Sequence, residues 1–346
     1  MGPMVTGQQD ARAFAAELVA NPRLWRLARS FDDSPAGLPA RIDYLRRIAA
    51  ELPPQDQQQA VLILEGWQSA DALPGMPEDA DLGARVLWLR EFARQRFDFR
   101  WGKERSFIPT TQELLEPAVA ELVYGIADDW GMSSPNEAAG DYDLVVVLGG
   151  LIRANVNRSA LAAQLLGDAL VKAPKVAALA GSRQLGPGEI ELARQIGCPV
   201  DTEEESLAWG MARAFGTSAS SWTSSSPGID ALSDTGDRVV MCGTAPTPGT
   251  GGRADTQTAF QWLLGAVPGI TTSTSRVLCV TSAIYWIDGH IRLLTQLPVG
   301  CELVTTGTAG VNADPLLAQT YLSQQYLQEV KSAINALPGL LAWAGD

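Results

Sequence analysis

The chain has 346 residues, of which 46% are hydrophobic and 19% are charged. These proportions are ordinary for a globular protein and exclude wholesale disorder. At about 150 residues per domain, the length predicts about two domains. The 39 acidic residues outnumber the 26 Lys and Arg and give a net charge of −13. This balance argues against a nucleic-acid groove and against docking on an anionic membrane, because both surfaces need clustered basic residues.

Residues 1–135 predict a helical domain. Apolar residues recur at helical spacing, as at Ile42, Leu45 and Ile48. Residues 110–113, Thr-Thr-Gln-Glu, resemble a capping box that opens a helix ending near Asp129, with Pro117 in its first turns. The predicted helical segments are 11–29, 42–49, 56–68, 81–98 and 110–129.

Beyond a linker at 133–140, the pattern changes to alternating strands and helices. The run 141–150 is apolar, rich in β-branched residues and ends in Gly-Gly, which is typical of a strand buried on both faces in a parallel sheet. This alternation predicts an α/β fold with a doubly wound sheet. The expected strands are 141–150, 175–181, 238–243, 276–282 and 301–306, and the expected helices are 158–171, 188–196, 203–215, 255–264, 287–296 and 314–336.

Two stretches break the alternation. Residues 216–237 begin with a Ser- and Thr-rich run, which is typical of a flexible surface insertion; the alternative is a mobile lid with Trp222 as its plug. Residues 243–252 are rich in Gly, Pro and Thr and connect a predicted strand to a predicted helix. Loops in that position bind ligands in open α/β sheets.

Backbone amides and guanidinium groups at the carboxyl edge of the predicted sheet are candidates for binding an anion. Gly149 and Gly150 end the first strand and would let a ligand approach the backbone closely. Arg153 and Arg158 follow them, and Arg183 follows the second strand. Arg158 is expected to open the next helix, where a cation opposes the macrodipole, so a purely helix-stabilising role is disfavoured. Its alternative role is a salt bridge at the surface or between domains.

Several carboxylates and one histidine are further candidates. Glu189 begins a predicted helix as a cap or a catalytic group, and residues 201–205 hold four carboxylates that suit a solvated helix N-terminus. Asp255 or Thr256 can cap the following helix and bond a ligand hydroxyl or amide. His290 is the only histidine, so a Ser-His-Asp or Cys-His mechanism would have to use it. No nucleophile elbow accompanies it, so catalysis by His290 is the less favoured interpretation.

In their order along the chain, these motifs resemble the ElyC/SanA/YdcF envelope-protein family, also called domain of unknown function 218. Residues 146–150 and Arg158 are similar to the family's V-V-L-G-G strand end and the Arg after it. Gly181, Ser182 and Glu189 resemble its S-G-G strand end and Glu-Ala helix. Residues 197–199, 253–259 and 280–282 resemble its Gly-Val-Pro, S-x-N-T-x-E-N and V-T-S motifs.

The chain departs from this family at two positions. Tyr285 stands where the family has His, and Asp288 stands where it has Arg. If the family's His and Arg hold an anionic group, this chain lacks both. The resemblance covers about 141–308 and includes neither the helical residues 1–135 nor the family's membrane anchor. It implies a Rossmann-like fold, a nucleotide-type or S-adenosylmethionine-like ligand, and no particular reaction.

The resulting hypothesis is an α/β protein with a Rossmann-like, doubly wound, mostly parallel sheet in 141–346, preceded by an all-α domain in 1–135. We expect a soluble cytoplasmic enzyme, such as a transferase that tailors small molecules, with a nucleotide-like or S-adenosylmethionine-like ligand at the carboxyl edge. The loss of the family's His and Arg favours the alternative of a non-catalytic ligand-binding or regulatory protein. A third hypothesis is an interaction scaffold built on the helical domain. An oligomer is compatible with all three.

Other features bear on compartment and metal binding. No apolar run approaches the ~20 residues that span a bilayer, and the first four residues lack the basic and apolar regions of a secretory signal. The four cysteines form no C-x-x-C pair, which argues against zinc and favours a reducing compartment. We therefore expect no metal, no membrane and no nucleic acid, and a small-molecule partner with an anionic or adenosine group.

The expected site combines these candidates. The catalytic candidates are Glu189, Tyr285 and Asp288. The expected ligand-binding residues are Gly149, Gly150, Arg153, Arg158, Gly181, Ser182, Arg183, Thr244, Asp255, Thr256 and Ser282.

Overall fold

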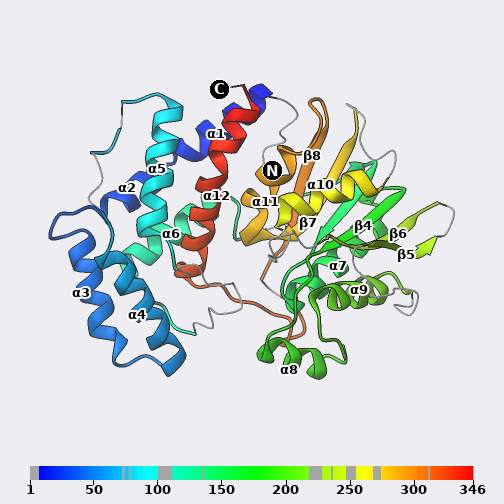
Figure 1. Ribbon diagram of the computed structural model, residues 1–346, viewed down its shortest axis with the longest axis horizontal. Helices are drawn as coiled ribbons and strands as arrows, with labels where there is room; N and C mark the ends of the chain where they lie inside the picture. Colours follow the sequence, from blue (N-terminus) through cyan, green and yellow to red (C-terminus); the bar gives the residue numbers. More distant parts are fainter. Residues whose placement is uncertain are drawn as a thin grey trace. The chain divides into compact units, whose positions relative to one another are not determined.

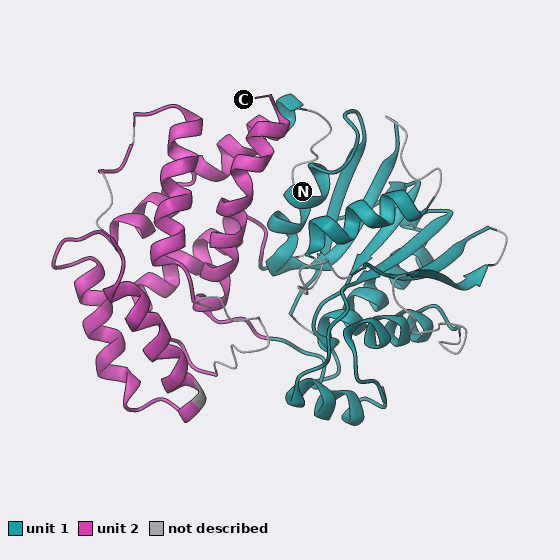
Figure 2. Ribbon diagram, in the orientation of Figure 1, with its two compact units in different colours: residues 1–10, 133–319 teal, residues 11–132, 320–346 magenta. Residues whose placement is uncertain are grey.

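The computed structural model divides the chain into two compact units (Figure 2). Unit 1 holds residues 1–10 and 133–319, and unit 2 holds residues 11–132 and 320–346. The residues that the structure describes are 8–71, 75–77, 79–99, 111–134, 136–217, 228–234, 237–246, 255–267, 274–310 and 312–345.

The described part of unit 2 is helical. Asn21 caps α2 by accepting hydrogen bonds from the amides of Arg23 and Leu24, and Pro22 stands in its first turn. Proline suits that position because it lacks the amide that a first-turn residue cannot use. The predicted segment 11–29 is therefore two helices. The helices are α1 (Gln8–Ala20, which begins in unit 1), α2 (Pro22–Arg29), α3 (Leu38–Ala49), α4 (Pro54–Gln68), α5 (Leu82–Arg96), α6 (Pro117–Asp129) and α12 (Ser323–Trp343).

The predicted capping box at 110–113 is wrong as a helix start. The amide and hydroxyl of Thr111 donate to the buried carboxylate of Asp56, each at 3.1 Å from Oδ2. The helix begins instead at Pro117, so a proline stands in its first turn, as Pro22 does in α2. Thr111 therefore ties the chain to the first turn of α4 rather than opening α6.

The last helix differs from its prediction in bounds and in partner. The sequence places it at 314–336 in the Rossmann-like domain, whereas α12 begins at Ser323 and belongs to unit 2. It packs against α5 and α6, with Leu327, Val330 and Ile334 fully buried. An apolar helix face after a strand fits a sheet or a helical bundle equally well, and the sequence pattern does not choose between them.

Unit 1 is built on a six-stranded sheet with the order β5-β6-β4-β2-β7-β8 (Figure 1). β5 pairs antiparallel with β6, and every other pair in this sheet is parallel. The expected α/β fold with a mostly parallel sheet is thereby confirmed. Its strands are β2 (Leu144–Leu148), β4 (Lys175–Ala180), β5 (Gly228–Asp234), β6 (Val239–Thr244), β7 (Arg276–Ser282) and β8 (Glu302–Thr308); β1 (Gly140–Asp141) and β3 (Val171–Lys172) form a small parallel pair.

Helices cover both faces of this sheet, as Figure 1 shows. Val145 and Val147 of β2 belong to a buried cluster with side chains of α7 and α9. Leu148, on the other face, approaches Gly289 of α11, and α10 packs beside α11. The helices of unit 1 are α7 (Ile152–Gly167), α8 (Pro187–Gln195), α9 (Glu203–Ala214), α10 (Thr256–Ala266) and α11 (Trp286–Leu294).

The order of the strands creates a reversal point beside β2. From β2 the chain proceeds outward through β4 to β6, and after α10 it continues on the other side of β2 with β7 and β8. The helices that leave β2 and β6 therefore cover different faces. In open α/β sheets, ligands bind outside the carboxyl ends of the strands at such a point.

Two predictions in unit 1 need correction. Residues 228–234, inside the expected Ser-rich insertion, form the edge strand β5, while Trp222 and the proposed lid lie outside the described residues. The helix after β2 begins at Ile152 rather than near Arg158, because Gly149 and Gly150 lead almost directly into it. Arg158 thus lies in the second turn of α7, and the argument that it opens the helix is wrong. Within the described ranges, no helix combines the length and apolarity needed to cross a membrane.

The assignment of α12 to unit 2 predicts where a core defect will be felt. Ile334→Ala should lower the free energy of unfolding by about 2–5 kcal/mol, because it leaves a cavity in a closed core. Hydrogen exchange should show the lost protection mainly in α5 and α6. Asn335→Ala, on the partly exposed face of the same helix, is the control. Protection lost mainly from β2 and β7 would contradict the division.

Candidate functional site

A pocket lies at the carboxyl ends of β2 and β4. It is small, with a cavity volume of about 30 Å³. The ends of β2 and β4 and the first turns of α9 and α10 meet around it, so four separate parts of the sequence form its wall. Gly149, Gly181, Asp255 and Thr256 are the expected ligand-binding residues that the structure brings together here. The full lining is Leu148, Gly149, Leu179, Ala180, Gly181, Glu203, Asp255, Thr256 and Ala259.

Gly149 is required by the close approach of β4. A Cβ at this position would lie 2.9 Å from the carbonyl oxygen of Leu179 and 3.1 Å from Oε1 of Glu203. The first of these contacts is with backbone, which cannot move aside as a flexible side chain can. The glycine therefore lets the loop after β2 pass directly over β4.

The glycine amides that follow β2 and β4 donate within the protein. Gly149 donates to the carbonyl of Leu179 at 2.8 Å, and Gly150 donates to Oδ1 of Asn155 at 2.7 Å. Gly181 donates to Oε1 of Glu203 at 3.5 Å. These amides are predicted to bind an anion, but each of them already donates to an acceptor of the protein.

Glu203 and Asn155 are site residues that sequence reasoning missed. The segment 201–205 was expected to be a solvated helix N-terminus, but Glu203 is 1% exposed and Glu204 is 5% exposed. Asn155 is fully buried and donates to the carbonyl of Glu203 at 3.2 Å. The available signal is a carboxylate that lies beside a Gly-rich strand end. Glu203 and the glycines at 149–150, however, lie more than fifty positions apart in the sequence. Of the predictions for residues 201–205, only the helix start is confirmed: Thr202 and Glu205 form the capping box of α9.

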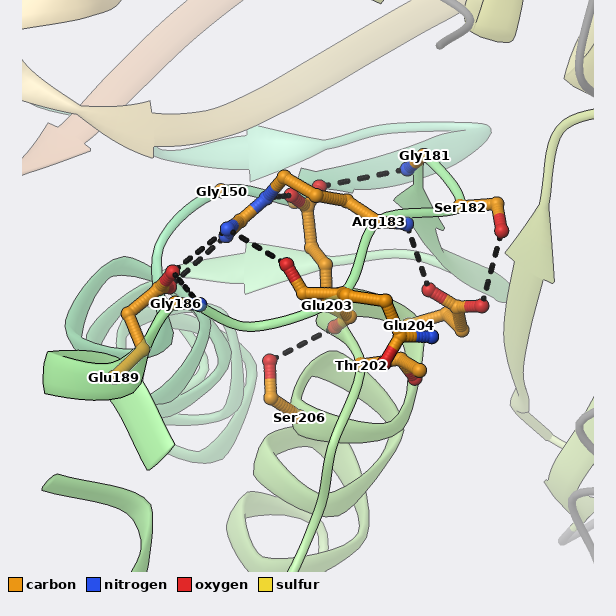
Figure 3. A network of polar contacts seen from close by, with 12 residues as sticks. Gly150, Gly181, Ser182, Arg183, Gly186, Glu189, Thr202, Glu203, Glu204 and Ser206 are labelled. Carbon is orange, nitrogen blue, oxygen red and sulfur yellow. Dashed lines mark hydrogen bonds and ion pairs between the residues drawn. The ribbon is translucent and has the colours of Figure 1, made fainter. Parts of the chain in front are cut away.

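Arg183 lies between two carboxylates, as Figure 3 shows. Its Nε donates to Oε2 of Glu203 at 2.9 Å, and its two terminal nitrogens donate to Glu189 at 2.6 and 2.9 Å. Burial alone would raise the pKa of Glu189, but the hydrogen bonds from Arg183 and from the Gly186 amide outweigh it and lower that pKa. Arg183 is thus an ion-pair partner inside unit 1, and Glu189 is its counter-charge and the cap of α8. Neither residue lines the pocket, and their expected anion-binding and catalytic roles stay predictions.

Arg158 joins the ends of β2 and β7. Its side chain is 2% exposed, and it donates to the carbonyls of Leu148 and Gly149 at 2.7 and 2.8 Å and to Oγ of Ser282 at 3.1 Å. The guanidinium also lies over the ring of Tyr285, 5.7 Å from its centre. Arg158, Ser282 and Tyr285 therefore do come together, but as a buried clamp and outside the lining of the pocket.

The remaining predicted residues have other partners. Nε of Arg153 donates to the carbonyl of Leu316 at 2.9 Å, away from the pocket lining. Asp288 pairs with Arg292 at 2.8 Å on α11. Thr244 is a buried residue at the end of β6, and Ser182 donates to Glu204 at 3.4 Å. None of these four lines the pocket.

His290 is buried in the core of unit 1. It is 1% exposed, and its Nδ1 lies 3.0 Å from Oγ1 of Thr305. Burial lowers its pKa to about 4. The imidazole is therefore neutral at physiological pH and does not line the pocket.

The described residues offer no metal site and no activated thiol. Within the described ranges, no group of three or more His, Cys, Asp or Glu side chains is placed to hold a metal ion. The cysteines are buried, and burial raises the pKa of Cys198, Cys242 and Cys279 to about 12. Thiolate chemistry at these three positions is therefore suppressed.

No family model, curated protein or solved structure matches this chain. The resemblance to the ElyC/SanA/YdcF family therefore stays a prediction from motif order. Its two departures have defined surroundings: Tyr285 stacks beside Arg158, and Asp288 pairs with Arg292.

The clamp predicts a stability defect for Arg158→Ala. The change leaves the carbonyls of Leu148 and Gly149 without this donor, which should lower the free energy of unfolding by about 2–3 kcal/mol in chemical denaturation. Arg153→Ala is the control, because that partly exposed side chain makes one hydrogen bond to backbone and should change stability by less than about 1 kcal/mol. Unchanged stability together with weaker binding of an anionic ligand would contradict the structural role.

The pKa of His290 predicts a titration that can be followed without assignment, since the chain has one histidine. Its folded pKa of about 4 lies below the ordinary value of 6.5, so the unfolded state binds the proton more readily. The stabilising contribution is complete above pH 6.5 and is lost as the pH falls toward 4. An NMR titration should show a neutral ring at pH 5.5. A midpoint near 6.5 would show an accessible imidazole instead.

Proposed function

We propose that this chain binds a nucleotide-like or S-adenosylmethionine-like small molecule in the pocket at the carboxyl ends of β2 and β4. The observation that carries the proposal is the position of the pocket beside the reversal of strand order. Numbered along the chain, the parallel strands β6-β4-β2-β7-β8 have the order third, second, first, fourth and fifth. This is the order of doubly wound, Rossmann-like sheets, which bind such ligands at this edge.

The composition of the pocket wall supports the same class of ligand. Gly149, Gly181, Ala180 and Ala259 present small side chains or bare backbone, a surface on which a flat ring or a thioether can lie. Carboxylates from α9 and α10 provide the polar contacts. A mainly small apolar wall with a few polar groups is the usual composition of a cofactor site.

Binding is the function that this geometry supports best. Among the described residues, the lining contains no His, Cys or Lys, which are the side chains that most often act as nucleophiles or proton carriers. A transfer enzyme is the second candidate. It is favoured by the carboxylates of Glu203 and Asp255, which border the pocket from two different helices, since a carboxylate can accept a proton from a ligand hydroxyl.

A bulky side chain introduced at the entrance of the pocket tests the proposal. Calorimetry with S-adenosylmethionine, S-adenosylhomocysteine, adenosine, AMP and ATP should identify a ligand of the intact chain. Thr256→Trp should weaken its binding at least tenfold, because Thr256 is partly exposed and lines the pocket. Thr258→Trp adds the same ring to an exposed position of the same helix and should leave affinity unchanged.

Two results would contradict the proposal. One is that no member of the panel binds. The other is that both tryptophan variants weaken binding equally, which would place the ligand elsewhere or indicate a general effect on α10. Release of a product from the bound ligand during the same experiment would favour the transfer enzyme over the binding protein.

A further inference from the structure

Two walls of the pocket come from segments that lie far apart in the sequence. One wall is the loop after β2, which contains Gly149, and the other is the first turn of α9, which contains Glu203. A Cβ on Gly149 would come within 3.1 Å of Oε1 of Glu203, so the two walls lie directly against each other. Because the cavity is small, a shift of either wall changes its shape. A contact that fixes the loop to the helix therefore governs the shape of the pocket.

Asn155 makes such a contact from the start of α7. Its Oδ1 accepts from the amide of Gly150 at 2.7 Å, and its Nδ2 donates to the carbonyl of Glu203 at 3.2 Å and to Oγ of Ser206. Side chains of an α-helix tilt toward its N-terminus, so a residue at position 155 can reach one that precedes the helix. The side chain is completely buried. It therefore ties the loop after β2 to the first turn of α9 away from competing water.

Small side chains bring α9 close enough to α7 for this contact. A Cβ on Gly210 of α9 would lie 3.1 Å from the carbonyl oxygen of Asn155 and 3.1 Å from Oγ of Ser159, both on α7. Oγ of Ser159 donates to the carbonyl of Asn155 at 2.7 Å, and Oγ of Ser206 donates to the carbonyl of Glu203 at 2.8 Å. The two serines thus bond carbonyls of their own helices, whereas the Asn155 side chain crosses from α7 to α9 and to the loop.

The backbone on both sides of Gly149 is held in the same way. Its amide donates to the carbonyl of Leu179 at 2.8 Å. Arg158, which follows Asn155 by one helical turn, donates to the carbonyls of Leu148 and Gly149. Asn155 then holds the next amide, that of Gly150. An amide side chain suits this position because it offers an acceptor to the loop and donors to α9 at once.

Resting on the proposed function, we infer that Asn155 is a positioning residue for ligand binding. It holds the loop after β2 and the first turn of α9 in the arrangement that forms the pocket. Asn155 is not among the residues that line the pocket, so it acts through Gly150 and Glu203. A ligand then meets walls that are already in place, and little binding free energy is lost in ordering them.

Hydrogen exchange of single amides tests the contact without a ligand. In the unaltered chain the amide of Gly150 should be protected, although it lies in a loop. Asn155→Ala should speed its exchange at least tenfold relative to the amide of Val146, a buried residue of β2 that reports any general loss of stability. Asn155→Asp should restore the protection, because its carboxyl oxygens can accept from Gly150.

Ser206→Ala is the matched control for this measurement. It removes a partner of Asn155 from the same buried network and leaves the acceptor of the Gly150 amide in place. An unprotected Gly150 amide in the unaltered chain, or the same exchange rate in Asn155→Ala and Ser206→Ala, would overturn the inference. If Asn155→Ala fails to fold, the shorter side chain of Asn155→Ser takes its place.

Ligand affinity then separates positioning from a merely structural role. In calorimetry with adenosine and S-adenosylmethionine, Asn155→Ala should weaken binding at least tenfold, whereas Ser206→Ala should weaken it less than twofold. Both variants lose a hydrogen bond of the same network, so a merely structural role would affect them alike. Equal losses, or unchanged affinity in Asn155→Ala, would overturn the positioning role and leave the proposed function standing. Failure of both probes to bind the unaltered chain would overturn the proposed function, and the exchange of Gly150 would still decide whether Asn155 holds the loop.

Discussion

The ion pair between Arg183 and Glu203 is the interaction on which the carboxyl edge of the sheet depends. Glu203 is almost completely buried, and a carboxylate in that environment is unfavourable without a counter-charge. Arg183 follows β4 and Glu203 begins α9, so the pair fixes the loop after the strand against the first turn of that helix. Glu189 occupies the other side of the same guanidinium and thereby adds α8 to the arrangement. One buried guanidinium thus organises three consecutive elements around the pocket.

The three arginines near this edge show how environment decides the role of one residue type. Arg183 is neutralised by carboxylates, Arg158 holds backbone carbonyls at the ends of two strands, and Arg153 bonds a carbonyl at the surface. A guanidinium suits an anionic ligand because it offers paired donors in a plane. The same geometry suits carbonyls and carboxylates of the protein itself. At this edge, acceptors of the protein itself have taken the donors of these three described arginines.

The helical unit depends on a long-range contact of a different kind. Its last helix, α12, comes after the whole of unit 1 in the sequence and packs on α5 and α6. Side chains from the loop before α6 complete its start: Glu113 accepts from the amide of Ser323 at 3.3 Å and from the hydroxyl of Tyr124 at 2.8 Å. Unit 2 is therefore completed only when α12 associates with the helices that precede unit 1 in the sequence. Because α12 follows unit 1 in the sequence, the helical unit cannot finish folding before unit 1 has been synthesised.

The sequence by itself determined the class of the fold and most of its elements. The apolar run at 144–148 and its successors are too continuous for one-sided burial, so a parallel sheet covered on both faces follows from the side chains alone. The glycines after β2 and β4 and the first turn of α10 were likewise predictable as the pocket wall, because parallel strands place their carboxyl ends at one edge. Local signals also fixed helix starts such as that of α9, which the acidic residues at 201–205 predict.

Only the tertiary structure decided the polar partners and the place of the last helix. Whether Glu203 is solvated or buried depends on the approach of α9 to α7, which is set by Gly210 and Asn155 rather than by the acidic segment itself. Whether Arg158 meets a ligand or a carbonyl depends on a helix that begins at Ile152. The apolar face of α12 likewise fits more than one core. Hydrophobic periodicity predicts that a surface is buried. Hydrogen bonds and ion pairs between distant segments can be assigned only when the three-dimensional positions of those segments are known. The polar surroundings of this pocket consist of such contacts.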